Sequence, residues 1–249
     1  MWQTEGFPSF HKEYIIPKGI VELIFNFSKD LSIVAQLGSK QYGVPNCFIN
    51  GLNTTPIQLL LPEQQVFFGV QIQSLAVKKI LGVPACEFSD ALVDLTLLDP
   101  VYHSLWHQLA EQTNFDNRVS VFTTWIEKKL PVWQPQEQFV NNFLSAVNQH
   151  DLSVTELAKS LCYSPRHLAR KMQEATGMNT EEILHYKKYL HALHLIHHTE
   201  LSLTEIAYES DFSDQSHFIR SFKTYTNMTP GGYKKSKGFV KGHIYVDVR

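Results

Sequence analysis

Residues 152–164, LSVTELAKSLCYS, recur 49 positions later as residues 201–213, LSLTEIAYESDFS. Six of these 13 positions are identical. A solenoid needs at least about three repeats to bury its core, so two copies indicate a duplicated motif instead. Beyond one inserted residue the correspondence continues with Arg170 and Arg220, Thr176 and Thr226, and Met178 and Met228.

Each copy has the pattern of a short helix that begins at a capping box. Ser153 with Glu156, and Ser202 with Glu205, have the spacing at which the Ser side chain caps the third helical residue while the Glu side chain reaches back. These pairs predict helices over residues 155–161 and 204–210. Ala158 and Ala207 are small enough for a second helix to cross close by.

A turn and a second helix follow in each copy. The turns are predicted at Cys162-Tyr163 and at Asp211-Phe212, and the second helices at Ser164-Pro165 and at Ser213-Asp214. Ser is a good N-cap, and Pro at the first helical position loses nothing because that N–H is unpaired anyway. Two short helices joined in this way form a helix-turn-helix, whose second helix can enter the major groove of DNA.

The second helices carry cationic and amide side chains on their predicted outer faces. Arg suits guanine and Gln suits adenine, whereas a merely solvated face is the alternative for either helix taken alone. Matching caps, turns and outward Arg residues in both copies favour DNA reading. The residues predicted to contact DNA are Arg166, His167, Arg170, Lys171, Gln215, Ser216, Ile219, Arg220 and Lys223.

Residues 139–236 resemble the DNA-binding domain of the AraC/XylS family of transcription regulators, which has two such motifs. The resemblance rests on both copies, on YLHALHLI at 189–196, and on SHFIRSFKTY at 216–225 followed by Thr229-Pro230 and Tyr233. It implies an all-α domain whose base-contacting positions fall on Arg166, Ala169, Arg170, Gln215, Ser216, Ile219 and Arg220. Ala169 offers only a methyl contact, and Asp211 stands where the family often has Gly, so the operator sequence stays open.

The segment between the copies predicts a stiff spacer. Residues 180–197 would form about 27 Å of helix, and successive major grooves on one face of DNA lie about 34 Å apart. One chain could therefore hold both second helices one helical turn apart, as the resemblance also implies.

The first half of the chain has strand periodicity. Residues 21–27, 58–61 and 66–72 are rich in β-formers and are separated by turn residues, and helical spacing takes over after Ser74. IPKG at 16–19, ELIFNF at 22–27 and FGVQI at 68–72 resemble a sensor domain that is found fused to this reader. We therefore expect an α+β chain: a β-rich, barrel-like domain with trailing helices, then an all-α domain with two helix-turn-helix motifs joined by a linker helix. An effector pocket is expected near Phe25, Phe27, Phe68 and Val70, with plain core as the alternative for each.

The expected boundaries are a sensor or dimerisation domain over 1–130, a linker over 131–137, a DNA-binding domain over 138–236 and a tail over 237–249. The tail pattern at Val240, Ile244, Val246 and Val248 suits a short strand, and a loose end is slightly favoured over return to the first sheet. The net charge is −2, so overall charge does not argue for nucleic acid.

Composition places the chain among cytoplasmic proteins without a membrane span. The three Cys are far apart, which argues against a disulfide scaffold, and the N-terminus lacks the pattern of a secretory signal. We expect double-stranded DNA as partner, and consider a small-molecule effector, RNA polymerase and a second copy of the chain as further partners.

Catalytic and metal-binding alternatives are weaker. His103, His107 and Glu111 share one predicted helix face and His191, His194 and His198 another, but polar faces explain both, and Cys47 and Cys86 lack basic neighbours that would activate a thiol. The rival hypothesis is a small-molecule-binding or metal-dependent barrel enzyme with a regulatory helical tail. Residues 12–102 contain no His, so we expect no enzyme, no cofactor and no bound metal.

Overall fold

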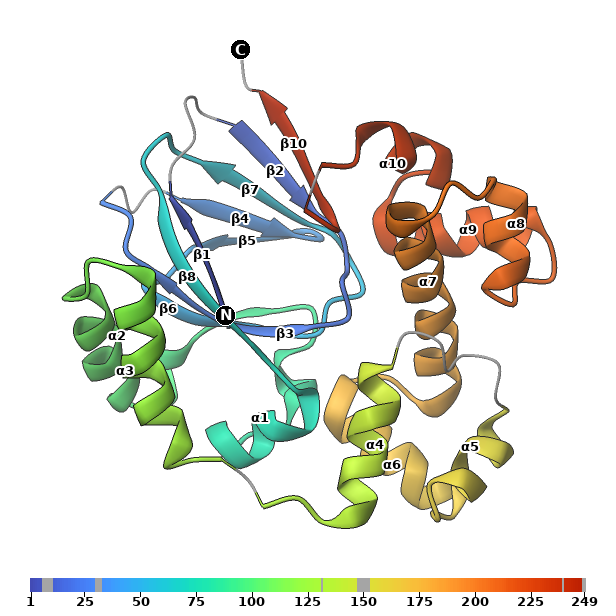
Figure 1. Ribbon diagram of the computed structural model, residues 1–249, viewed down its shortest axis with the longest axis horizontal. Coiled ribbons are helices and arrows are strands. Elements are labelled where there is room, and N and C mark those ends of the chain that lie inside the picture. Colours follow the sequence, from blue (N-terminus) through green and yellow to red (C-terminus); the bar gives the residue numbers. More distant parts are fainter. Residues whose placement is uncertain (6–10, 30–32, 131, 147–152, 239, 248–249) are drawn as a thin grey trace.

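The computed structural model describes residues 1–249 apart from 6–10, 30–32, 131, 147–152, 239 and 248–249. Pro131 of the expected linker, Leu152 at the start of the first repeat and Val248 of the tail therefore lie outside the described residues. The expected α+β architecture is confirmed: a β-rich domain with its own helices precedes a helical domain (Figure 1).

Two antiparallel five-stranded sheets face each other in the first domain. The strands of the first sheet, in spatial order, are β1 (Trp2–Glu5), β8 (Val66–Ile72), β3 (Val21–Asn26), β6 (Cys47–Asn50) and β9 (Leu92–Asp94). Those of the second are β10 (His243–Asp247), β2 (His11–Ile15), β7 (Ile57–Leu61), β4 (Val34–Leu37) and β5 (Lys40–Gly43).

Strand β3 is buried along its whole length, which explains its imperfect hydrophobic alternation. Successive side chains of a strand point to opposite faces of the sheet. Leu23 and Phe25 pack into the core on the helical side, and Ile24 belongs to a separate apolar cluster between the sheets. A strand covered on both faces does not need a polar face.

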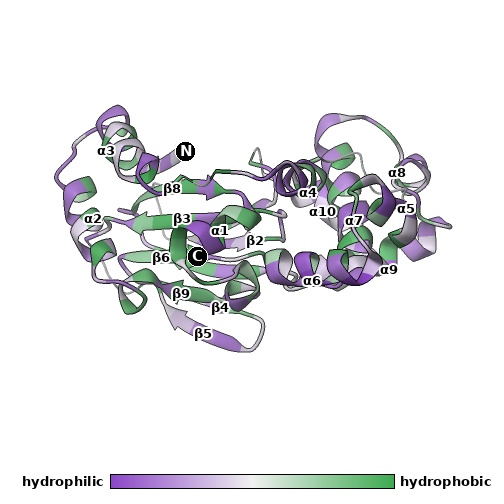
Figure 2. Ribbon diagram, turned by 90° about the horizontal axis from the view of Figure 1, so that it is seen from below, coloured by the Kyte–Doolittle hydropathy of each residue, from purple (hydrophilic) through white to green (hydrophobic). Residues whose placement is uncertain are grey.

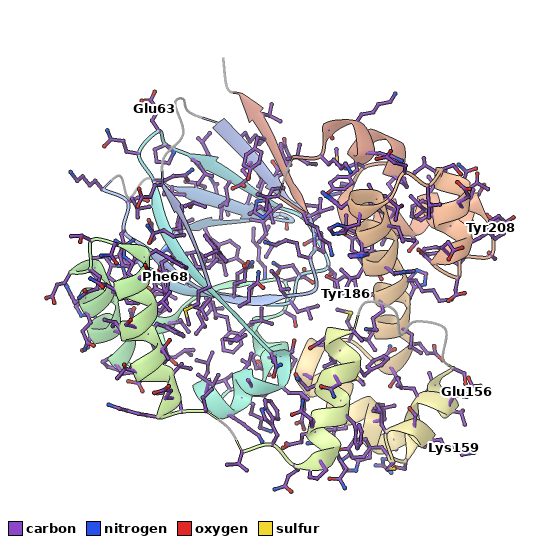
Figure 3. The ribbon with its side chains drawn as sticks, viewed as in Figure 1. Glu63, Phe68, Glu156, Lys159, Tyr186 and Tyr208 are labelled. Atoms are coloured by element: carbon purple, nitrogen blue, oxygen red, sulfur yellow. The ribbon has the colours of Figure 1, made fainter. Side chains whose placement is uncertain are left out.

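The helical side of the first sheet is covered by α2 (Val101–Ala110) and α3 (Phe115–Glu127). The ring of Phe122 in α3 lies with its centroid 6.0 Å from that of Phe25 and 6.3 Å from that of Phe68. Figure 3 shows Phe68 on β8 close to these helices. The remaining helical elements of this domain are α1 (Ser74–Leu81), η1 (Ala85–Phe88) and η2 (Leu95–Leu97).

The second domain is helical until the last strand. It contains α4 (Pro135–Ser145), α5 (Val154–Ser160), α6 (Pro165–Thr176), α7 (Thr180–His198), α8 (Leu203–Glu209), α9 (Gln215–Thr226) and α10 (Pro230–Ser236). Helix α4 begins inside the expected linker, because Gln134 and Glu137 form a capping box around Pro135 at the first helical position.

The expectation of a loose C-terminal end is wrong. Residues 243–247 form β10, which pairs antiparallel with β2 so that Ile244 lies opposite Tyr14. Ile244 is 5% exposed, so its burial and the open edge of β2 together favour docking. The tail therefore belongs to the first domain, although it follows the second in sequence.

Among the described residues, no helix combines the length and the hydrophobicity that a transmembrane segment requires.

Candidate nucleic-acid interface and inter-sheet cavity

Both predicted capping boxes are confirmed, and their geometry is nearly the same. In the first copy the Glu156 N–H donates to Ser153 Oγ at 3.3 Å, and the Ser153 N–H donates to Glu156 Oε2 at 2.9 Å. The corresponding distances for Ser202 and Glu205 are 3.3 Å and 2.7 Å. A hydrogen bond from the Ser side chain, followed by the one from the Ser N–H, lowers the pKa of each Glu carboxyl. The caps start α5 and α8 one residue earlier than predicted.

The turns of the two copies also match. Cys162 and Asp211 both have left-handed backbones, with φ of 56° and 55°. The next residue closes each turn: the Tyr163 N–H donates to the Ala158 carbonyl at 2.9 Å, and the Phe212 N–H to the Ala207 carbonyl at 3.0 Å. Asp211 thus adopts the conformation for which the family often uses Gly, so this departure leaves the motif intact.

The second helices begin at two different caps. Ser164 caps α6 as predicted, but the cap of α9 is Asp214 and not Ser213. Asp214 Oδ1 accepts the His217 N–H at 2.7 Å, and this hydrogen bond lowers the pKa of its carboxyl. A carboxylate at this position also interacts favourably with the helix dipole.

One threonine ends each of the second helices. The correspondence of Thr176 with Thr226 in the two copies does not by itself reveal this role. Thr176 Oγ1 donates to the Met172 carbonyl at 2.7 Å and accepts the Met178 N–H at 3.1 Å. Thr226 repeats both contacts with the Phe222 carbonyl and the Met228 N–H, at 2.7 Å and 3.2 Å. The matched Thr and Met positions are therefore a shared helix end.

The structure separates the predicted DNA-facing residues from the core as expected. Leu168 and Met172 of α6 and Phe218 and Phe222 of α9 are all 0% exposed. Helices α6 and α9 lie along the same edge of the helical domain (Figure 2). The exposed predicted residues are Arg166, Arg170, Gln215, Ser216, Arg220 and Lys223, and the half-buried ones are His167, Ala169, Lys171 and Ile219.

Two contacts near this face do not follow from the sequence. Thr204 of α8 donates its hydroxyl to Gln215 Oε1 at 3.2 Å. Lys188 of α7 also donates to the Asp211 carbonyl at 2.8 Å and holds the second turn. Neither pair has a sequence spacing that would predict the contact.

Helix α7 joins the two readers, α5–α6 and α8–α9. It has 19 residues, which corresponds to about 28 Å, close to the length expected from the sequence. Asn179 and Glu182 form a capping box at its start. Figure 1 shows α7 between the two readers, with α5–α6 at one end and α8–α9 at the other.

A cavity of about 420 Å³ lies between the two sheets of the first domain. The cavity is not lined by the predicted pocket residues Phe25, Phe27, Phe68 and Val70. The expected pocket position is therefore wrong, because the cavity lies on the opposite faces of the strands. Those side chains pack toward the helices, whereas the apolar part of the wall comes from the opposite faces of the strands. The apolar lining includes Ile24, Phe48, Ile57, Leu61, Phe67 and Leu92.

A connected polar network forms another part of the cavity wall. His243 Nδ1 lies 2.6 Å from Glu13 Oε1, and its Nε2 lies 3.1 Å from Lys18 Nζ. Lys18 Nζ lies 3.5 Å from Glu22 Oε2, and the Trp2 indole N–H donates to Glu22 Oε1 at 3.0 Å. A charged residue inside the apolar strand VELIFN is a signal for Glu22, whereas β2, with the sequence HKEYI, offers no such signal for Glu13.

The alternative sites are not assembled into metal centres. The rings of His103 and His107 lie edge to face with centroids 4.5 Å apart, but the described part of the chain holds no group of three or more His, Cys, Asp or Glu residues placed to bind a metal ion. Cys47 is buried, and burial raises the pKa of its thiol far above the usual value.

Family comparisons assign the two halves of the chain separately. Residues 157–236 match the family described as "Helix-turn-helix domain", and residues 1–94 match one described as "Domain of unknown function (DUF6597)". The C-terminal domain is therefore a helix-turn-helix domain of the AraC type, as the resemblance predicted.

Curated relatives match part of the chain. The HTH-type transcriptional activator RhaS of Escherichia coli (strain SE11) is 28% identical over 134 residues, which cover 52% of this chain and 42% of RhaS. An uncharacterized HTH-type transcriptional regulator of Staphylococcus aureus (strain MSSA476) is 32% identical over 98 residues, 38% of this chain and 13% of that protein. The chain thus spans less than half the length of RhaS and about an eighth of the length of the S. aureus regulator.

Solved structures share the overall fold. ToxT from Vibrio cholerae matches with a TM-score of 0.52 at 14% identity, over 94% of this chain and 97% of that chain. ToxT from V. cholerae O395 bound to (E)-4-(8-methylnaphthalen-1-yl)but-3-enoic acid matches with a TM-score of 0.53 at 15% identity, over 94% and 98%. At these identities the likeness concerns the fold alone.

Proposed function

We propose that this chain, whose C-terminal domain belongs to the AraC type, is a sequence-specific DNA-binding transcription regulator and not an enzyme. The observation that carries the proposal is the duplicated reader. Two helix-turn-helix motifs share caps, left-handed turns and helix ends, and one continuous helix joins them. Such a pair suits two successive major grooves of one duplex.

Base reading is assigned to the outward side chains of α6 and α9. Arg166 and Arg170 suit guanine edges in one groove, and Arg220 suits a guanine in the next. Gln215 offers donors, since its Oε1 already accepts the Thr204 hydroxyl. Lys171 and Lys223 are proposed to contact phosphates, which position the protein without reading sequence.

The first domain is proposed as the regulatory half, with residues 1–130 and the tail acting together. Its inter-sheet cavity has an apolar wall and a few convergent polar groups, as small-molecule sites usually do. A small-molecule effector is therefore the proposed signal, with dimerisation through this domain and contact with RNA polymerase as further partnerships.

Selection of duplexes from a random library, followed by binding titrations, tests the proposal. We expect a selected duplex to bind at least about a thousandfold more tightly than random DNA at physiological salt, with affinity falling steeply as salt rises because Lys and Arg displace phosphate counterions. Equal affinity for selected and random DNA would contradict sequence-specific regulation.

A further inference from the structure

The C-terminal strand connects the two domains through the backbone. Five residues of β10 lie opposite five of β2, from His243 opposite Ile15 to Asp247 opposite His11. The Ile16 N–H also donates to the Gly242 carbonyl at 2.9 Å. Residues beyond the second reader are thus built into the second sheet of the first domain.

The start of this strand is held by α10, which packs against the second reader. The Gly242 N–H donates to Tyr233 Oη at 3.0 Å, and Tyr233 of α10 is 0% exposed. Tyr233 Oη lies 2.6 Å from His197 Nε2 of α7, and the Tyr233 ring centroid lies 5.7 Å from that of Phe222 in α9. One buried tyrosine therefore contacts the strand, the linker helix and a recognition helix.

The inward side of the same segment is a wall of the inter-sheet cavity. Val240, His243 and Tyr245 all line it. His243 contributes the contacts to Glu13 and Lys18 that join the tail to the polar network. Without the segment 240–247 the cavity would lose these three side chains and open on one side.

We propose that β10 is a strap that couples occupancy of the inter-sheet cavity to the position of the second reader, an inference that rests on the proposed function. The ligand class that fits is an amphipathic small molecule, with an apolar body against Ile24, Phe48 and Phe67 and a polar end at Glu13, Lys18 and His243. Such a molecule makes its full contacts only while the strap is docked, so it stabilises the docked state. By linkage, the docked strap raises the affinity for the ligand by the same factor.

A proline substitution in the strap tests the coupling in the full chain. The Ile16–Gly242 hydrogen bond sets the phase of the ladder, so the Val246 N–H faces Lys12 of β2. Val246 is 46% exposed, hence Val246→Pro removes a ladder bond with little loss of packing, and Val246→Thr keeps the bond as the matched control.

Amide hydrogen exchange provides the first readout. In Val246→Pro we expect exchange to rise about tenfold or more in β2 and also in α9 and α10, with α5 unchanged, because local opening spreads through packed neighbours. Tyr233→Phe, which removes the anchor of Gly242 but no ladder bond, should raise exchange at the start of β10 as well. The coupling would be overturned if exchange in α9 and α10 stayed unchanged in both variants while exchange in β2 became faster.

Fluorescence titration with Nile red, a neutral amphipathic dye, provides the second readout. We expect Val246→Pro to weaken dye binding about tenfold relative to Val246→Thr. Leu59→Trp narrows the cavity and should also weaken dye binding, in a chain whose strap is unchanged. Unchanged dye affinity in Val246→Pro, or no binding to the wild-type chain, would overturn the ligand part. Specific DNA binding is measured separately. Failure of the proposed function would appear as equal affinity for selected and random DNA, whereas failure of the strap proposal would appear in the exchange and dye measurements alone.

Discussion

Tyr189 of α7 donates its phenol hydroxyl to the carbonyl of Pro17, in the first domain, at 2.8 Å. One turn earlier, Tyr186 Oη accepts the Gly19 N–H at 3.1 Å and donates to the Asn53 carbonyl at 2.9 Å. Both tyrosines are 0% exposed, and Figure 3 shows Tyr186 on the side of α7 that faces the first domain. The helix that joins the readers is therefore fixed to the first domain by buried hydrogen bonds.

Removing the Tyr189 hydroxyl should destabilise the whole chain. Tyr189→Phe leaves the Pro17 carbonyl without this donor in a buried position, which typically costs about 1–3 kcal/mol. Tyr208→Phe is the control, because Tyr208 is 64% exposed and should change the free energy of unfolding by less than about 0.5 kcal/mol. Urea unfolding of both variants measures the difference; equal stability would show that the contact contributes nothing.

A substitution at Gly19 tests how closely the first domain approaches α7. A Cβ at Gly19 would lie 2.4 Å from Leu190 Cδ1, and the backbone φ there is +71°. Gly38 has a similar φ of +59°, but a Cβ there would meet nothing within 4 Å. Gly19→Ala should therefore cost about 1–3 kcal/mol more than Gly38→Ala, since only the first crowds a neighbour. Equal costs in thermal or urea unfolding would mean that Leu190 yields freely.

Loss of one outward arginine should relax base discrimination at one position. Arg170→Ala and Arg220→Ala should each cost about 1–3 kcal/mol on the selected duplex, with preference lost at one base pair. Lys40→Ala, which removes one charge from β5 in the first domain, should leave affinity almost unchanged. Titrations against single-base variants measure the effect. Equal losses on selected and random DNA would assign these side chains to phosphates instead.

Acid should weaken the fold through His197. Burial, followed by Lys237 and Lys241, lowers the pKa of His197 from 6.5 to about 4. The unfolded chain then binds a proton between these values that the folded chain does not, so the free energy of unfolding decreases as pH falls from 6.5 toward 4. His197→Gln should flatten this part of the pH profile, whereas His198→Gln at the exposed neighbour should not. Parallel profiles for the wild type and His197→Gln would contradict the assignment.

The features that could be predicted from the sequence are those whose determining contacts are local. The capping boxes of Ser153 and Ser202 follow from a spacing of three residues, and the left-handed turns and helix ends repeat in both copies. The cap of α9 was misplaced by one residue, because Ser213 and Asp214 are both good caps and only the backbone geometry decides between them.

Long-range contacts were not predictable in the same way. The cavity lies on the Ile24 face of β3 and not on the Phe25 face, because both faces of that strand are covered and its side chains are apolar on each. The docking of β10 depends on the open edge of β2, some 230 residues earlier in the chain. Neither a periodicity nor a spacing in one sequence carries that information.

A hydroxyl-radical footprint of the full chain on its selected duplex tests whether the protein reads two successive major grooves. We expect two protected segments on one face of the DNA, about 10–10.5 base pairs apart, with Arg170→Ala weakening one and Arg220→Ala the other. A single protected segment, or the loss of the same segment in both variants, would contradict a protein that reads two successive major grooves with α6 and α9.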